Sequence, residues 1–142
     1  MYVLPLKTAT CSSHWVLLCV RWGGIGIDRR PKQVGEPRPS MVQVMTDLFK
    51  QHPELVMLVT PEGTRARQEQ WKTGFYYVAV NAGVPIALAY MDYEQKKAGV
   101  GKIIHPTGNF EEDMAEIMDF YAGIQAKFPQ DFSVDQRYYK AG

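Results

Sequence analysis

The chain has 142 residues and a formal net charge of +1, with 46% apolar and 22% charged residues. This length corresponds to about one domain, and the composition is typical of a globular protein rather than a disordered or fibrous one. The balanced charge gives no general attraction for nucleic acid, so we expect no nucleic-acid partner. The longest apolar run, residues 15–20, is far shorter than the ~20 residues that span a bilayer.

The two cysteines, Cys11 and Cys19, lack a CxxC spacing, and the sequence shows no secretory leader. Both are therefore expected to be reduced, passive thiols of a cytoplasmic protein. No spacing of His, Cys, Asp or Glu suggests a metal site, so we expect no metal and no bound cofactor.

The first half of the chain predicts one helix and two strands. Residues 1–22 show no clear period, and residues 23–27 are typical of a short strand. Ser40 is a good N-cap for a helix over residues 41–51, in which apolar side chains recur on one face and which ends at His52 and Pro53. The continuous apolar run 55–59 favours a strand buried on both faces of a parallel sheet.

The second half predicts two more helices and two more strands. Residues 75–82 favour a helix that stops at Gly83, and residues 84–90 favour another buried strand. After a turn at 94–99 and a short strand at 101–105, Asn109 is expected to cap a helix with apolar residues at helical spacing through Ile124.

This order of elements indicates one α/β domain. We expect a mixed, partly parallel sheet flanked by helices. The domain is expected to span residues 1–142, with 1–22 uncertain, 23–126 as the core and 127–142 as a tail.

Two polar clusters follow predicted strands and suit an anionic ligand. Arginine matches phosphate oxygens in pairs, and a glycine lets backbone N–H groups approach a ligand. Ligands of open α/β sheets bind at the carboxyl ends of strands, where these clusters are expected. The alternative is that Glu62 forms a structural ion pair with an arginine and that the first cluster is a solvated turn. The first cluster is Asp28, Arg29 and Arg30, and the second is Glu62, Gly63, Thr64 and Arg65, with Arg67 close behind.

Three motifs in this order resemble those of the glycerolipid acyltransferase family, which includes lysophosphatidic acid acyltransferases. They are Gly-Gly-Ile-Gly-Ile-Asp-Arg at 23–29, Thr-Pro-Glu-Gly-Thr-Arg at 60–65 and Val-Pro-Ile at 84–86. The resemblance covers about residues 22–108, and the sequence Trp-Lys-Thr-Gly-Phe-Tyr-Tyr at 71–77 and the final helix look like a bacterial branch. Thr60 stands where the family more often has phenylalanine.

The resemblance implies transfer of a fatty acyl group to a hydroxyl of a glycerol phosphate or lysophospholipid, in phospholipid biosynthesis. The acyl donor would be a thioester of coenzyme A or acyl carrier protein, and any membrane contact is expected to be peripheral, at the inner face. Arg29 would bind the acceptor phosphate and Glu62 its hydroxyl. Gly63, Thr64 and Arg65 would complete the acceptor pocket, and Val84, Pro85 and Ile86 would form an apolar wall near the acyl chain.

The first motif of this family, HxxxxD, is absent from the chain. Its histidine is the general base that removes the proton of the attacking hydroxyl, and its aspartate orients the imidazole. His14, His52 and His105 are followed five positions later by Cys, Met and Phe, so we interpret all three as structural. We expect no acyl transfer by this chain alone, and we expect the motif to be encoded upstream of Met1. A truncated gene model and a real loss both remain open.

Two other functions remain as alternatives. The first is a non-catalytic domain that binds phospholipid or glycerol phosphate with the same arginines, and the second is an α/β domain in which the motif match is accidental. The aromatic cluster of Trp71, Phe75, Tyr76 and Tyr77 beside Lys72 is also compatible with base stacking, but aromatic residues at helical spacing favour a core.

Overall fold

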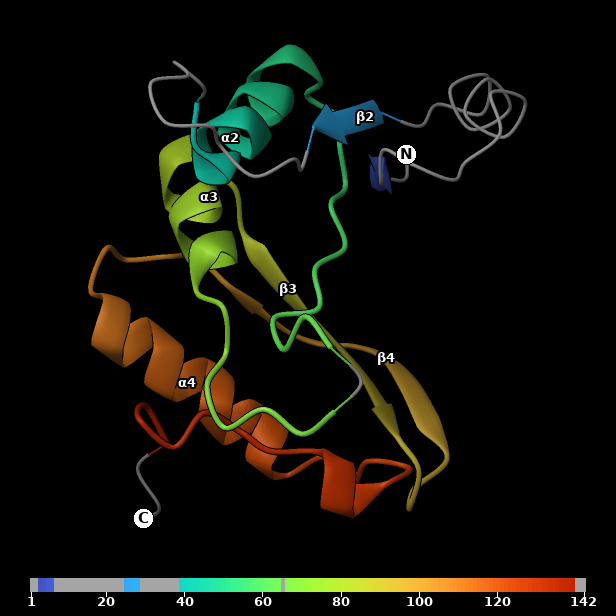
Figure 1. Cartoon of the computed structure of the whole chain (residues 1–142). Coiled ribbons are helices and arrows are strands. Elements are labelled where there is room, and N and C mark those ends of the chain that lie inside the picture. Colours follow the sequence, from blue (N-terminus) through green and yellow to red (C-terminus); the bar gives the residue numbers. More distant parts are fainter. Residues whose placement is uncertain (1–2, 7–24, 29–38, 65, 140–142) are drawn as a thin grey trace. The chain divides into compact units, whose positions relative to one another are not determined.

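The computed structural model describes residues 3–6, 25–28, 39–64 and 66–139 (Figure 1). The chain divides into two compact units, Met1–Val59 and Thr60–Gly142. Helices and strands occur in both units, which confirms the predicted α/β class.

The described residues of the first unit form a parallel strand pair and one helix. Strand β1 (Val3–Leu6) pairs in parallel with β2 (Ile25–Asp28). Helix α2 (Met41–Gln51) begins after Ser40, whose hydroxyl accepts a hydrogen bond of 3.1 Å from the Gln43 backbone N–H. It ends at His52, directly before Pro53. Local capping therefore sets this helix where the sequence predicts it.

The prediction of a strand at residues 55–59 is wrong. These residues form no helix or strand, and although Leu55 is buried, Val56 and Leu58 are 76% and 81% exposed. A strand requires a neighbour that accepts its backbone hydrogen bonds, and no described strand pairs with this run. The described strands form two two-stranded sheets, one parallel and one antiparallel.

The second unit begins with helix α3 (Gly74–Ala82) and an antiparallel hairpin. Gly83 ends α3 in the left-handed region, at φ 67°, and its N–H bonds the carbonyls of the last turn, as the sequence predicts. Strand β3 (Ile86–Asp92) pairs antiparallel with β4 (Lys97–Ile104), with a register shift at Leu88. Strand β4 begins before the predicted residue 101 because the intervening turn occupies only residues 93–96.

Helix α4 (Phe110–Ala122) lies along the β3–β4 hairpin and covers one of its faces (Figure 1). A short 3₁₀ helix, η1 (Pro129–Asp131), follows it. Among the described helices, none combines the length and the apolar character needed to cross a bilayer. The buried core comprises Trp71, Leu88, Ile104, Met114, Ile117, Met118 and Val134. Val134 shows that the segment expected to be a tail contributes to this core.

Candidate functional site

The sequence Pro-Glu-Gly-Thr forms a tight turn at residues 61–64, here called the 61–64 turn. The Gly63 N–H donates a hydrogen bond of 3.0 Å to the Thr60 carbonyl, and Gly63 has φ 69°. This left-handed conformation strains residues that carry a Cβ atom, which explains the glycine. The Thr64 hydroxyl accepts a bond of 3.2 Å from the Ala66 N–H. The turn follows an exposed extended segment and not a buried strand.

Glu62 carries a carboxylate oxygen that is buried but not hydrogen-bonded. Its Oε1 atom is shielded from solvent and accepts no hydrogen bond from the residues that the structure describes. Burial raises the pKa of the Glu62 carboxyl above its ordinary value of 4.5, because desolvation penalises the charged form. An orphaned acceptor of this kind is unusual in a folded protein, and it suits a ligand that brings a donor.

The Lys72 side chain lies against Gly63 of the 61–64 turn. A Cβ atom built on Gly63 would lie 2.7 Å from Lys72 Nζ and 3.1 Å from Lys72 Cε. The Lys72 N–H also donates a hydrogen bond of 2.9 Å to the Pro61 carbonyl. Lys72 is thus held against the 61–64 turn, which lies nine or more residues earlier in the chain.

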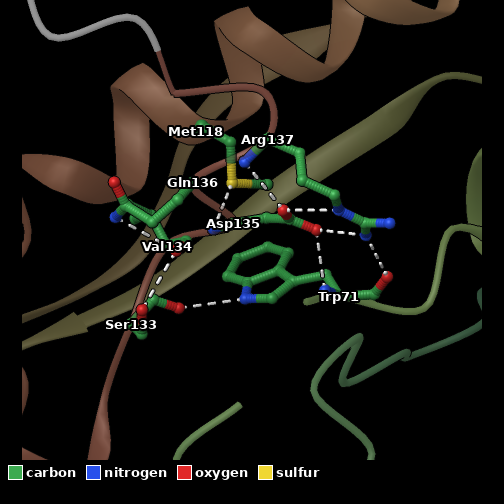
Figure 2. A network of polar contacts seen from close by, with 7 residues as sticks. All are labelled: Trp71, Met118, Ser133, Val134, Asp135, Gln136 and Arg137. Atoms are coloured by element: carbon green, nitrogen blue, oxygen red, sulfur yellow. Dashed lines mark hydrogen bonds and ion pairs between the residues drawn. The ribbon is translucent and has the colours of Figure 1, made fainter. Parts of the chain in front are cut away.

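A polar network holds the segment that carries Lys72 (Figure 2). The fully buried carboxylate of Asp135 accepts a bond of 2.8 Å from the Trp71 N–H. The Trp71 indole N–H donates to the Ser133 carbonyl at 3.0 Å. Arg137 donates to Asp135 through Nε at 2.9 Å and through a terminal nitrogen at 2.6 Å. Ser133 and Asp135 therefore fix Trp71, the residue next to Lys72.

Two parts of this arrangement are not predicted from the sequence. Asp135 and Arg137 have no predicted role, because no local pattern marks a carboxylate whose partner lies 64 residues away. Lys72 stands out in the sequence only beside the aromatic cluster. The expected core role of that cluster is confirmed for Trp71 and Tyr76, which are buried, whereas Tyr77 is half-exposed.

The structure brings some of the predicted site residues together. Glu62, Gly63 and Thr64 share the 61–64 turn, whereas Arg29 and Arg65 lie outside the described residues. At the start of β3, Ile86 packs against the core, and Val84 donates from its N–H to the Ala79 carbonyl. No described hydrogen bond links the predicted wall of Val84, Pro85 and Ile86 with the 61–64 turn.

A shallow depression lies on the second unit but does not include the 61–64 turn. It measures about 330 Å³, and its lining includes Arg67, Ile124, Phe132 and Tyr139. No described group of three or more His, Cys, Asp or Glu side chains has the arrangement of a metal site. His52 caps α2 and His105 follows β4. Their positions at element ends confirm what the sequence predicts for both.

Replacing Glu62 by glutamine is expected to stabilise the protein more at neutral pH than in acid. Because its pKa is raised in the folded protein, Glu62 is protonated in both the folded and the unfolded protein at any pH below its pKa in the unfolded state. As the pH rises through the folded pKa, the carboxylate ionises in a desolvated position and stability is lost. Thermal unfolding of wild type and Glu62→Gln at about pH 4 and about pH 7 measures this difference. A midpoint difference that does not grow with pH would contradict it.

The site combines an unpaired carboxylate oxygen of Glu62, a glycine in the left-handed region and the Lys72 ammonium against that glycine. Such a set suits a ligand that carries both a hydroxyl donor and a negative charge. No protein-family model, curated protein or solved structure matches this chain.

Proposed function

We propose that this chain is the acceptor-binding part of a glycerolipid acyltransferase. Its acceptor would be a glycerol phosphate or a lysophospholipid, and its acyl donor a thioester of coenzyme A or acyl carrier protein. The proposal also specifies the fold: an acyltransferase-like domain with a partly parallel sheet. The three ordered motifs of the sequence support it, of which the one at 60–65 is the most specific.

The observation that carries the proposal is the unpartnered Oε1 atom of Glu62. The motif resemblance implies that this residue holds the acceptor hydroxyl, and a hydroxyl is a donor that can satisfy a carboxylate oxygen. A buried acceptor without a partner costs about 1–3 kcal/mol, so a ligand hydroxyl that donates to it recovers interaction energy.

Acyl transfer requires a base in addition to this pocket. The hydroxyl oxygen attacks the thioester carbonyl carbon, a C–O bond forms, the C–S bond breaks, and the hydroxyl proton ends on the departing thiol. A histidine oriented by an aspartate moves that proton in the family. None of the three histidines of this chain has the HxxxxD spacing. The chain is therefore proposed to bind the acceptor and not to transfer an acyl group alone.

Binding and turnover test the proposal separately. We expect the chain to bind glycerol 3-phosphate in a calorimetric titration, and we expect Glu62→Ala and Arg65→Ala to weaken that binding. With acyl-coenzyme A and the same acceptor, thiol release measured with a thiol reagent is expected to stay at background.

Each result has a defined meaning. Failure to bind glycerol 3-phosphate or lysophosphatidate would overturn the proposed acceptor site. Thiol release above background that Arg65→Ala removes would show that the chain contains a base outside the HxxxxD spacing. Binding without turnover, even after an HxxxxD-bearing upstream segment is supplied, would favour the non-catalytic phospholipid or glycerol-phosphate binding domain.

A further inference from the structure

We propose that Lys72 is a ligand of the acceptor's anionic group, in addition to the arginines that the motifs suggest. This inference rests on the proposed function and extends it, because it assigns a recognition role to a residue outside the three motifs. The Lys72 side chain lies against Gly63, close enough that a Cβ atom there would meet Nζ at 2.7 Å. This ammonium therefore lies against the residue that follows Glu62 in the chain.

The Lys72 ammonium forms no ion pair with the residues that the structure describes. Ion pairs among the described residues join Lys50 to Asp47, Lys102 to Glu116 and Arg137 to Asp135. None of these pairs involves Lys72 or Glu62. No described ion pair therefore neutralises either the Glu62 carboxylate or the Lys72 ammonium, and each retains its capacity to bind a ligand.

The pairing of these two groups selects a class of ligand. Ionised Glu62 accepts hydrogen bonds and Lys72 donates them, so a molecule that carries a hydroxyl and an anion a few bonds apart can satisfy both. A phosphate monoester of a small polyol has this combination. A neutral alcohol leaves Lys72 unused, and inorganic phosphate leaves the Glu62 oxygen without the alcohol donor. Lys72 is therefore assigned to distinguish phosphorylated acceptors from neutral ones.

The position of Lys72 is fixed from both sides. Its own N–H is bonded to the Pro61 carbonyl at 2.9 Å, and the preceding residue, Trp71, is held by Asp135 through a bond of 2.8 Å. Arg137 adds a contact of 3.4 Å to the Trp71 carbonyl. A backbone held in this way reduces the entropy that the lysine loses when it binds an anion.

Calorimetric titration of the full chain with glycerol 3-phosphate, inorganic phosphate and glycerol tests the assignment. We expect Lys72→Met to weaken binding of both anions by about tenfold or more, because a charge-assisted hydrogen bond is lost. Lys127→Met is the matched control, since the Lys127 ammonium lies 5.3 Å from the ring centre of Phe128. This control removes the same charge and is expected to leave binding unchanged. Lys72→Gln and circular dichroism exclude a folding defect.

The outcomes separate this inference from the proposed function. Equal binding of glycerol 3-phosphate by wild type and Lys72→Met would overturn the role of Lys72 and leave the acceptor site standing. A second outcome is that phosphate binding depends on Lys72, that glycerol 3-phosphate binds no more tightly than phosphate, and that Glu62→Ala has no effect. This outcome would support Lys72 as an anion ligand and overturn the acyl-acceptor proposal. Binding of neither anion would overturn both.

Discussion

Replacing Asp135 by alanine is expected to lower the free energy of unfolding by about 1.5–3 kcal/mol, because it removes a buried carboxylate that accepts several hydrogen bonds. The Asp135 side chain is fully buried. Its Oδ2 atom accepts from the Trp71 N–H at 2.8 Å, and both of its oxygens accept from Arg137 (Figure 2). The substitution leaves the buried Trp71 N–H without a partner. Chemical denaturation followed by tryptophan fluorescence measures the loss.

Arg137→Met removes the ion pair and keeps the bond from Trp71 to Asp135. The Arg137 side chain is 43% exposed, but its loss leaves the buried Asp135 carboxylate without a cation. We therefore expect Arg137→Met to lower the free energy of unfolding as well. A loss below about 1 kcal/mol for Asp135→Ala would show that the network contributes little and that the segment is held by apolar contacts.

Acid is expected to reduce the difference between wild type and Asp135→Ala. Burial by itself raises the pKa of the Asp135 carboxyl, but hydrogen bonds from Arg137 and Trp71 outweigh it and hold the pKa below its ordinary value of 3.8. A depressed folded pKa contributes stability that is present above the unfolded pKa and is lost as the pH falls through the folded pKa. The same denaturation series, extended into acid, measures this convergence.

Replacing Asp113 by alanine is expected to cost about 3 kcal/mol, because a buried carboxylate with several donors is removed. Asp113 accepts from the Tyr76 hydroxyl at 2.6 Å, the Thr107 N–H at 2.8 Å and the Thr107 hydroxyl at 3.0 Å. These bonds join α3, the loop before α4 and α4 itself. Chemical denaturation provides the measurement, and an effect within about 0.5 kcal/mol of wild type would contradict the expectation.

Tyr76→Phe separates one bond of this network from the others. It removes only the hydroxyl and is expected to cost about 1–2 kcal/mol. In the wild type, burial, the hydrogen bond to Asp113 and the negative charge of Asp113 raise the pKa of Tyr76 to about 12. In an absorbance titration, we expect one tyrosine to ionise at an unusually high pH. This ionisation should be missing in Tyr76→Phe and should occur at a lower pH in Asp113→Ala. Titration of every tyrosine at its ordinary pKa in the folded protein would contradict this assignment.

The buried network of Asp135 and the candidate site are connected through the chain. Asp135 fixes Trp71, and the next residue, Lys72, is bonded to Pro61 at the start of the 61–64 turn. Loss of Asp135 should therefore loosen the residues that present Lys72. We therefore expect loss of Asp135 to act first on stability and, through the position of Lys72, second on anion binding.

The sequence alone predicts the helices. Their signals are local: Ser40 caps α2, Gly83 supplies the left-handed end of α3, and the apolar residues after Asn109 recur with helical period. It also determined the 61–64 turn, because Gly63 adopts a conformation that glycine favours.

The sheets and the geometry of the site depend on contacts between distant parts of the chain. An apolar run such as residues 55–59 predicts a strand, but a strand forms only where another strand pairs with it, and that partner is not encoded in the run. The same holds for Lys72 against Gly63 and for Asp135 against Trp71, which are separated along the chain by 9 and 64 residues. Contacts between distant residues depend on how the whole chain packs, so no local pattern predicts them.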